Sequence, residues 1–74
     1  MSINSDIISP FDGVIHQVNF QTGDTVKEGD VLFSISVKGV ELDILSPLDG
    51  RLDKIEVSSK DPVIPGMVLA TIVE

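Results

Sequence analysis

Apolar residues in this chain fall in short runs that Gly, Pro, Ser or Asp interrupts roughly every ten positions. No segment keeps apolar residues at the i, i+3, i+4, i+7 spacing of an amphipathic helix. Runs rich in Val, Ile, Leu and Phe between turn signals are typical of β-strands. The pattern predicts an all-β chain with six main strands, at 6–9, 14–20, 31–36, 40–45, 51–57 and 68–73.

The sequence also repeats itself once. Shifting the chain by 37 positions aligns 6–35 with 43–72, and twelve of the thirty pairs are identical. The identical residues of the first copy are Asp6, Ile7, Ser9, Pro10, Asp12, Gly13, Asp24, Val26, Gly29, Val31, Leu32 and Ile35. Because a solenoid needs at least about three repeats, the two copies predict one domain over 1–74, with pseudo-two-fold symmetry between 1–37 and 38–74.

Turn signals recur with the repeat. Ser-Pro-x-Asp-Gly stands at 9–13 and again at 46–50. Proline fixes φ, and we expect Gly13 and Gly50 to supply a positive φ. Val26 and Val63 each lie between two tight turns and are expected to form short edge segments.

The second strand of each copy breaks strict alternation. Its apolar residues are Ile15, Val18 and Phe20 in the first copy and Leu52, Ile55 and Val57 in the second. A spacing of three and then two places them on one face only if an extra residue is inserted. We therefore predict a β-bulge near His16-Gln17 and another near Asp53-Lys54.

Composition excludes several functions. Twelve acidic residues against five basic ones give a net charge of −7, which repels nucleic acid and anionic membranes. The same acidity suits either solubility or docking on basic enzyme surfaces. The chain has no cysteine and one histidine, so neither a disulfide nor a metal site is expected.

Targeting signals are also missing from the sequence. No apolar stretch approaches the roughly 20 residues that span a bilayer, and 1–6 lacks the basic start and apolar core of a signal peptide. We expect a cytoplasmic protein. The start at Met1 and the end one residue after Val73 favour a complete small protein.

The two Ser-Pro-x-Asp-Gly motifs, with Gly-Asp-Thr-Val-Lys-Glu-Gly-Asp-Val-Leu at 23–32, resemble the biotinyl/lipoyl carrier domains over nearly the whole chain. The resemblance implies a flattened β-barrel, or barrel-sandwich hybrid, of two antiparallel sheets related by a pseudo-two-fold axis. It also implies that both termini lie at one end and that the modified lysine lies on a hairpin tip at the other.

Symmetry leads to the same hairpin, because 38–40 are the repeat partners of 1–3. If the termini occupy one pole, Lys38 and Gly39 occupy the opposite one. Val37-Lys38-Gly39-Val40 is typical of a two-residue hairpin with a type I′ turn, in which glycine accepts the positive φ of the second central position. Lys38 is the candidate attachment residue, and Val37, Lys38, Gly39 and Val40 are the candidate partner contacts.

This tip departs from the family pattern. Members of the carrier family that this chain resembles typically have Met-Lys-Met at the tip for biotin or Asp-Lys-Ala for lipoate, with an acidic residue three positions before the lysine. The resemblance matches Glu41, Asp43 and Ile44 to the stretch that follows the biotinyl lysine. Counting back from Pro47 with this match puts the attachment position on Gly39, so that Lys38 stands one residue early. Val40 replaces the second Met, and Ser36 replaces the acid.

Three functions follow. The favoured one is a non-catalytic docking or assembly module whose attachment tip is degenerate. The second is a swinging-arm carrier of biotin or lipoate on Lys38, served by a ligase and by multi-domain carboxylase or acyltransferase enzymes. The third is the core of a membrane-fusion adaptor, a group with similar half-motifs whose halves are usually split by a helical insertion.

Enzymatic activity is not expected. His16 is the only imidazole, its repeat partner is Asp53, and no Cys or Ser/His/Asp set accompanies it. We interpret His16 as a surface residue beside a bulge. Acid pairs such as Asp24 and Asp61 recur because their turns recur.

Overall fold

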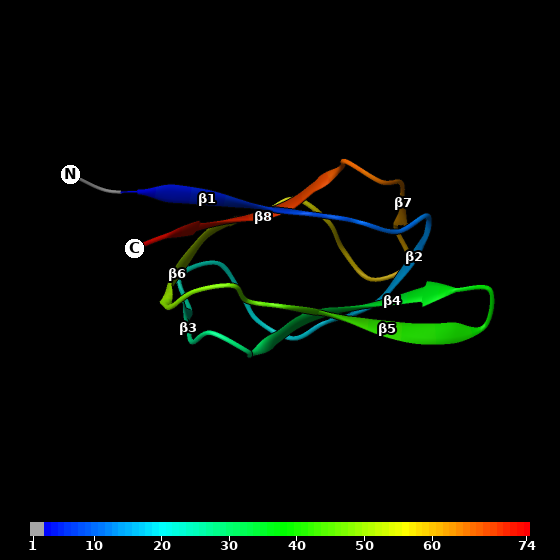
Figure 1. Ribbon diagram of the computed structural model, residues 1–74, viewed down its shortest axis with the longest axis horizontal. Helices are drawn as coiled ribbons and strands as arrows, with labels where there is room; N and C mark the ends of the chain where they lie inside the picture. The colour runs from blue at the N-terminus through cyan, green and yellow to red at the C-terminus, as the bar shows by residue number, and fades with distance from the viewer. Residues whose placement is uncertain (1–2) are drawn as a thin grey trace.

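The computed structural model describes residues 3–74, which form eight antiparallel strands in two four-stranded sheets (Figure 1). The strands are β1 (Asn4–Ile8), β2 (Gly13–Val18), β3 (Thr25–Val26), β4 (Val31–Val37), β5 (Val40–Leu45), β6 (Gly50–Ile55), β7 (Pro62–Val63) and β8 (Val68–Val73). One sheet has the order β1-β8-β6-β3 and the other β5-β4-β2-β7. The molecule is elongated, with extents of 40 × 19 × 17 Å.

Strand order reproduces the sequence repeat. A shift of 37 residues carries β1 to β5, β2 to β6, β3 to β7 and β4 to β8, and it carries each pairing of one sheet onto the equivalent pairing of the other. Both sheets are completed by the short third strand of the opposite copy: β3 pairs with β6, and β7 pairs with β2. The prediction of an all-β, pseudo-two-fold sandwich is confirmed, and the sheets are flattened rather than closed into a barrel.

Strand number differs from the prediction in a simple way. The segments at Val26 and Val63, expected as short edges, each pair over two residues and so count as strands. Both valines are fully buried, at 0% and 1% exposure. Six long strands plus these two give eight.

Both predicted bulges are present. The β2–β4 register skips His16, between Ile15 and Gln17, and the β6–β8 register skips Asp53, between Leu52 and Lys54. The extra residue turns outward, so that Ile15 and Leu52 stay buried while His16 and Asp53 are exposed.

The core lies between the sheets and draws on both copies. Its buried members are Ile7, Ile15, Val26, Leu32, Phe33, Ile35, Ile44, Leu52, Val57, Val63, Leu69, Ala70 and Ile72. Two further register shifts skip Leu32 and Leu69, which the sequence did not predict. Continuous apolar runs such as 31–33 show no alternation, so nothing in them marks a bulge.

The expectation of a positive φ at Gly13 and Gly50 is wrong. Neither glycine is among those with positive φ, which are Gly23, Gly29, Gly39 and Gly66. A Cβ on Gly50 would lie 2.6 Å from Ile72 Cγ2 and 2.7 Å from the Val73 carbonyl oxygen. One on Gly13 would collide with the Ser36 carbonyl oxygen. Glycine is needed here because the neighbouring strand passes too close for a side chain.

Serine explains the rest of the turn motif. Ser9 and Ser46 are buried, and their hydroxyls donate to the carbonyls of Phe11 at 2.9 Å and Leu48 at 2.6 Å. Such local hydrogen bonds from a side chain hold a turn by satisfying backbone groups that strand pairing leaves without a partner. Asp24 and Asp61 likewise accept from backbone N–H groups three residues earlier, each at 2.8 Å. These repeated acids are part of the architecture, as the sequence indicated.

Candidate functional site: the hairpin tip

The β4–β5 hairpin ends in a two-residue turn. Val37 pairs with Val40, and the central residues Lys38 and Gly39 have φ values of 50° and 82°. Positive φ at both central positions defines the predicted type I′ turn, whose twist matches the flanking strands. Lys38 adopts the left-handed region although it has a Cβ. The pairing of Val37 with Val40 on either side of the turn holds it there.

This tip lies at the opposite pole of the molecule from the start of β1 and the end of β8 (Figure 1). The N–H of Glu74 donates to the Ile3 carbonyl at 3.0 Å, and a shift of 37 residues relates this contact to the pairing of Val37 with Val40. The hairpin therefore stands where the symmetric pole has Ile3 and Glu74. Of the repeat partners of 38–40, positions 1 and 2 lie outside the described residues.

The tip is open to solvent. Lys38 and Gly39 are exposed, and Val40 is 57% exposed, whereas Val37 is half-buried against the core. No heavy atom lies within 4 Å of a Cβ built on Gly39. The turn thus presents one primary amine and one apolar side chain, and it has room for a second side chain at position 39.

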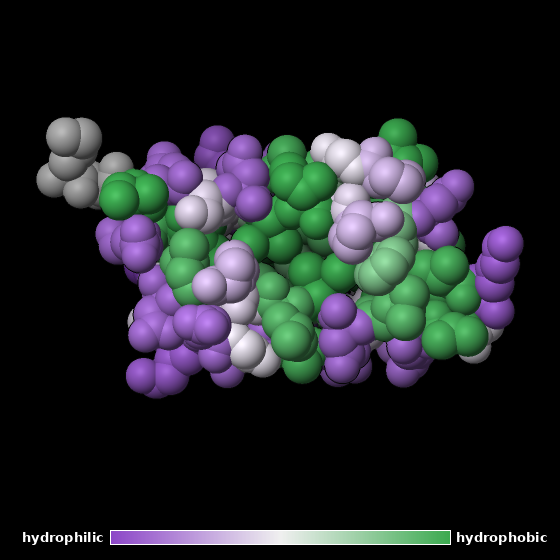
Figure 2. Space-filling model, in the orientation of Figure 1, coloured by the Kyte–Doolittle hydropathy of each residue, from purple (hydrophilic) through white to green (hydrophobic). Residues whose placement is uncertain are grey.

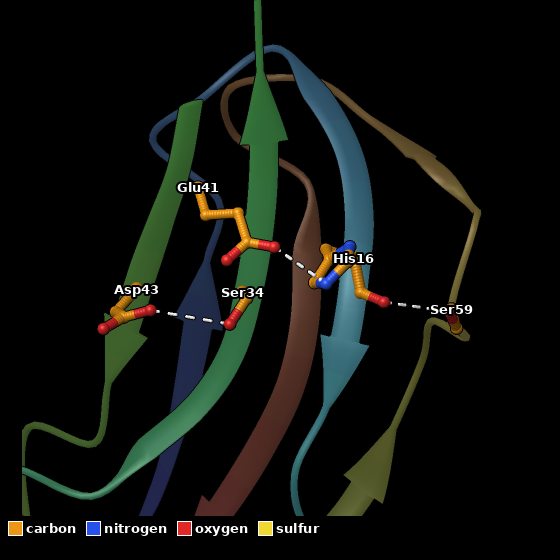
Figure 3. Close-up of polar contacts among 5 residues, drawn as sticks. All are labelled: His16, Ser34, Glu41, Asp43 and Ser59. Carbon is orange, nitrogen blue, oxygen red and sulfur yellow. Dashed lines mark hydrogen bonds and ion pairs between the residues drawn. The ribbon is translucent and has the colours of Figure 1, made fainter. Parts of the chain in front are cut away.

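A polar cluster follows the outer face of the same sheet (Figure 3). His16 Nε2 lies 2.7 Å from Glu41 Oε1, which joins β2 to β5 across β4, and both side chains are more than half exposed. Ser59 donates to the His16 backbone carbonyl at 3.0 Å rather than to its ring. The imidazole therefore has a carboxylate partner but no hydroxyl nucleophile aligned with it, and an exposed pair of this kind typically contributes less than about 1 kcal/mol.

Comparison of the two copies shows which contacts of this cluster recur with the repeat and which occur only once. Ser34 Oγ lies 3.5 Å from Asp43 Oδ1, and Thr71 Oγ1 donates to Asp6 Oδ1 at 3.1 Å in the equivalent place. The His16–Glu41 pair has no such equivalent, because the repeat partners are Asp53 and Asn4. His16 is itself the extra residue of the bulge that the sequence predicted near His16-Gln17.

Neither a metal centre nor a membrane span is found in residues 3–74. No three His, Cys, Asp or Glu side chains of this part of the chain are placed to hold a metal ion. No helix in it is long and apolar enough to cross a bilayer.

Sequence reasoning missed a groove on the pseudo-two-fold axis. It has a volume of about 280 Å³ and lies between equivalent residues of β1 and β5 and the turns that follow them. Its lining residues are Asp6, Ile7, Ile8, Pro10, Phe11, Asp43, Ile44, Leu45 and Pro47. The available signal was Ile8 and its partner Leu45, apolar residues that follow a buried position in both copies and that are 44% and 50% exposed.

Solved structures show which class this architecture belongs to. The Kluyveromyces lactis urea carboxylase is 25% identical with a TM-score of 0.88, over 96% of this chain and 6% of that chain. The lipoyl domain of the 2-oxoglutarate dehydrogenase complex from Azotobacter vinelandii is 27% identical with a TM-score of 0.81, over 93% of this chain and 95% of that chain. A single-chain, multi-domain long-chain acyl-CoA carboxylase shares the fold, at 16% identity and a TM-score of 0.86, over 92% of this chain and 7% of that chain. The chain is a biotinyl/lipoyl-type domain.

A protein-family model narrows the class. The model described as "RND MFP, barrel-sandwich hybrid domain" matches residues 4–74. The chain belongs to this barrel-sandwich hybrid family. A search of curated protein sequences finds no match.

Proposed function

We propose that this domain is a non-catalytic docking and assembly module that binds protein partners through the hairpin tip formed by Val37, Lys38, Gly39 and Val40. The observation that carries the proposal is the register of the turn. Gly39 stands where the carrier pattern has its lysine, and Lys38 occupies the first central position instead, at φ 50°. Neighbouring side chains in a tight turn project in different directions, so a ligase that acts on one position does not receive an amine at the other.

Family membership supports the same function. The matching family model is described as an RND MFP barrel-sandwich hybrid domain, and that description names neither biotin nor lipoate. The exposed Val40 beside a single cation gives the tip a small mixed apolar and polar surface, which suits the margin of a protein interface. The solved neighbours are domains of larger enzymes or enzyme complexes, as expected of a domain that works against other proteins.

The second candidate is a swinging-arm carrier with biotin or lipoate on Lys38. It is favoured by the carboxylase and the lipoyl domain among the structural neighbours, each at least 25% identical to this chain. The exposed Lys38 amine could hold either group as an amide: the amine nitrogen bonds to the acyl-adenylate carbonyl carbon, AMP leaves, and the amine gives up a proton. The protein would then only position the group for chemistry done elsewhere.

Rebuilding the usual tip tests the register argument. The double variant Lys38→Met with Gly39→Lys restores a lysine at the expected position, where the structure leaves room for it. The φ of 82° at position 39 costs a residue with a side chain on the order of 1 kcal/mol of stability. Folding of the variant is therefore first checked by its NMR spectrum. Both chains are then incubated with biotin and lipoate ligases.

Labelling of the variant alone, or of neither chain, is expected of a docking module. Labelling of the natural chain at least as fast as the variant would refute the proposal and establish the carrier.

A further inference from the structure

The groove between β1 and β5 is a second surface, separate from the hairpin tip. Figure 2 shows apolar residues gathered over the middle of one face, with a hollow among them. Ile7 and Ile44 are buried beside the groove, and Ile8 and Leu45 line it while about half exposed. Pairs of exposed apolar side chains around a hollow mark interaction sites more often than single ones do.

Charge at this groove has one sign. Asp6 and Asp43, which are repeat partners, both line it, and no Lys or Arg of residues 3–74 does. Asp6 meets Thr71 and Asp43 meets Ser34 through Oδ1, and neither Oδ2 has a hydrogen bond or ion pair within the described chain. The apolar lining thus carries one carboxylate from each copy, and both can accept from a cation.

The strands beside the groove are sheet edges. β1 pairs only with β8, and β5 pairs only with β4, so each is the last strand of its sheet. An edge strand presents unpaired N–H and C=O groups that an extended segment can pair with. Side chains of such a segment alternate, so that residues i and i+2 face the same way.

We propose that this groove binds an extended segment of a partner protein in which an apolar side chain lies between two basic ones at alternate positions. The apolar side chain fills the hollow between Ile8 and Leu45, and the basic side chains bind Asp6 and Asp43. The segment pairs with the edge of β1 or β5. Because this surface shares no residue with the tip, the proposal stands whether Lys38 is modified or not.

A labelled titration tests the proposal directly. The 15N-labelled chain in about 0.15 M salt, where long-range attraction is screened, is titrated with the peptide acetyl-Arg-Ser-Leu-Ser-Arg-amide. We expect saturable shifts of the Ile7, Ile8, Ile44 and Leu45 amides, with a dissociation constant on the order of 1 mM or tighter. The peptides in which serine replaces leucine, or glutamate replaces arginine, should bind at least about fivefold more weakly.

Variants separate the groove from the general acidity of the chain. Asp6→Asn with Asp43→Asn should weaken binding about fivefold or more. The control Asp53→Asn with Glu56→Gln makes the same change in net charge at exposed side chains with no hydrogen bond or ion pair in residues 3–74, and it should stay within about twofold. Ile8→Ser should also weaken binding while both carboxylates remain.

Three outcomes would overturn the proposal. The first is the absence of saturable shifts up to several millimolar peptide, and the second is an equal loss in the control variant. The third is a shift of the groove amides with protein concentration alone, since the occupant would then be a second copy of this chain.

Discussion

Lys60 occupies the position that Gly23 occupies one repeat earlier, and both have positive φ, 76° and 96°. Each backbone N–H donates at 2.7 Å to an equivalent carbonyl of the opposite copy, Ile15 for Lys60 and Leu52 for Gly23. The turn therefore imposes a left-handed conformation whichever residue stands there. In the second copy a side chain with a Cβ bears that strain.

Lys60→Gly should therefore stabilise the domain. Relief of the left-handed strain outweighs the added flexibility of the unfolded chain by about 0.5–1 kcal/mol. In a chain of this size the midpoint of thermal unfolding should rise by about 2–8 °C. The matched change Lys54→Gly, on strand β6 without a positive φ, should lower it. A drop for both variants in calorimetry would mean that Lys60 is not strained.

Crowding, rather than backbone angle, should govern substitutions at Gly50. Gly50→Ala should cost about 1–3 kcal/mol of unfolding free energy, because Ile72 and the Val73 carbonyl must move. Asn tolerates positive φ better than Ala, but φ at Gly50 is not positive, so this tolerance gives Asn no advantage there. Because its side chain is larger, Asn should cost more unfolding free energy than Ala at Gly50.

Gly66 provides the contrasting control, since its φ is 92° and nothing lies within 4 Å of a built Cβ. There Asn should cost less than Ala. Urea unfolding of the four variants measures both orders, and a milder effect of Asn than of Ala at Gly50 would contradict the crowding explanation.

The buried serines should matter more than an exposed one. Ser46 is 2% exposed, and its hydroxyl donates to the Leu48 carbonyl. Ser46→Ala removes this donor. The loss should be about 1–2 kcal/mol of unfolding free energy. Ser59→Ala, which also removes a donor to a carbonyl but at an exposed site, should cost less than about 0.5 kcal/mol. Equal losses in chemical denaturation would show that Ser46 does not hold its turn.

Much of the fold could be predicted because both copies obey the same local rules. Gly39 after Lys38 predicted the type I′ turn, and the uneven spacing of Ile15 and Val18 predicted the bulge near His16-Gln17. These signals are local: a turn needs particular φ values, and a buried face needs a fixed spacing. The repeat then indicated the pseudo-two-fold symmetry before any strand pairing was known.

Contacts between distant residues could not be predicted in this way. The neighbours that force glycine at position 50 are Ile72 and Val73, and the partner of His16 lies beyond an intervening strand. The groove arises only when β1 and β5, which do not pair, are brought to the same face. Local sequence patterns report spacing within a strand and not which distant segments meet, so these contacts left no signal beyond the repeated apolar pair Ile8 and Leu45.

The most direct test of the proposed function is the intact mass of the natural chain after expression with biotin and lipoate ligases, followed by peptide mapping around Lys38. A docking module predicts the unmodified mass in a folded sample, while a known acceptor domain in the same preparation is labelled. A cofactor-sized increment on Lys38 would contradict the proposal, because it would show that the displaced lysine is an attachment site and that the domain is a carrier.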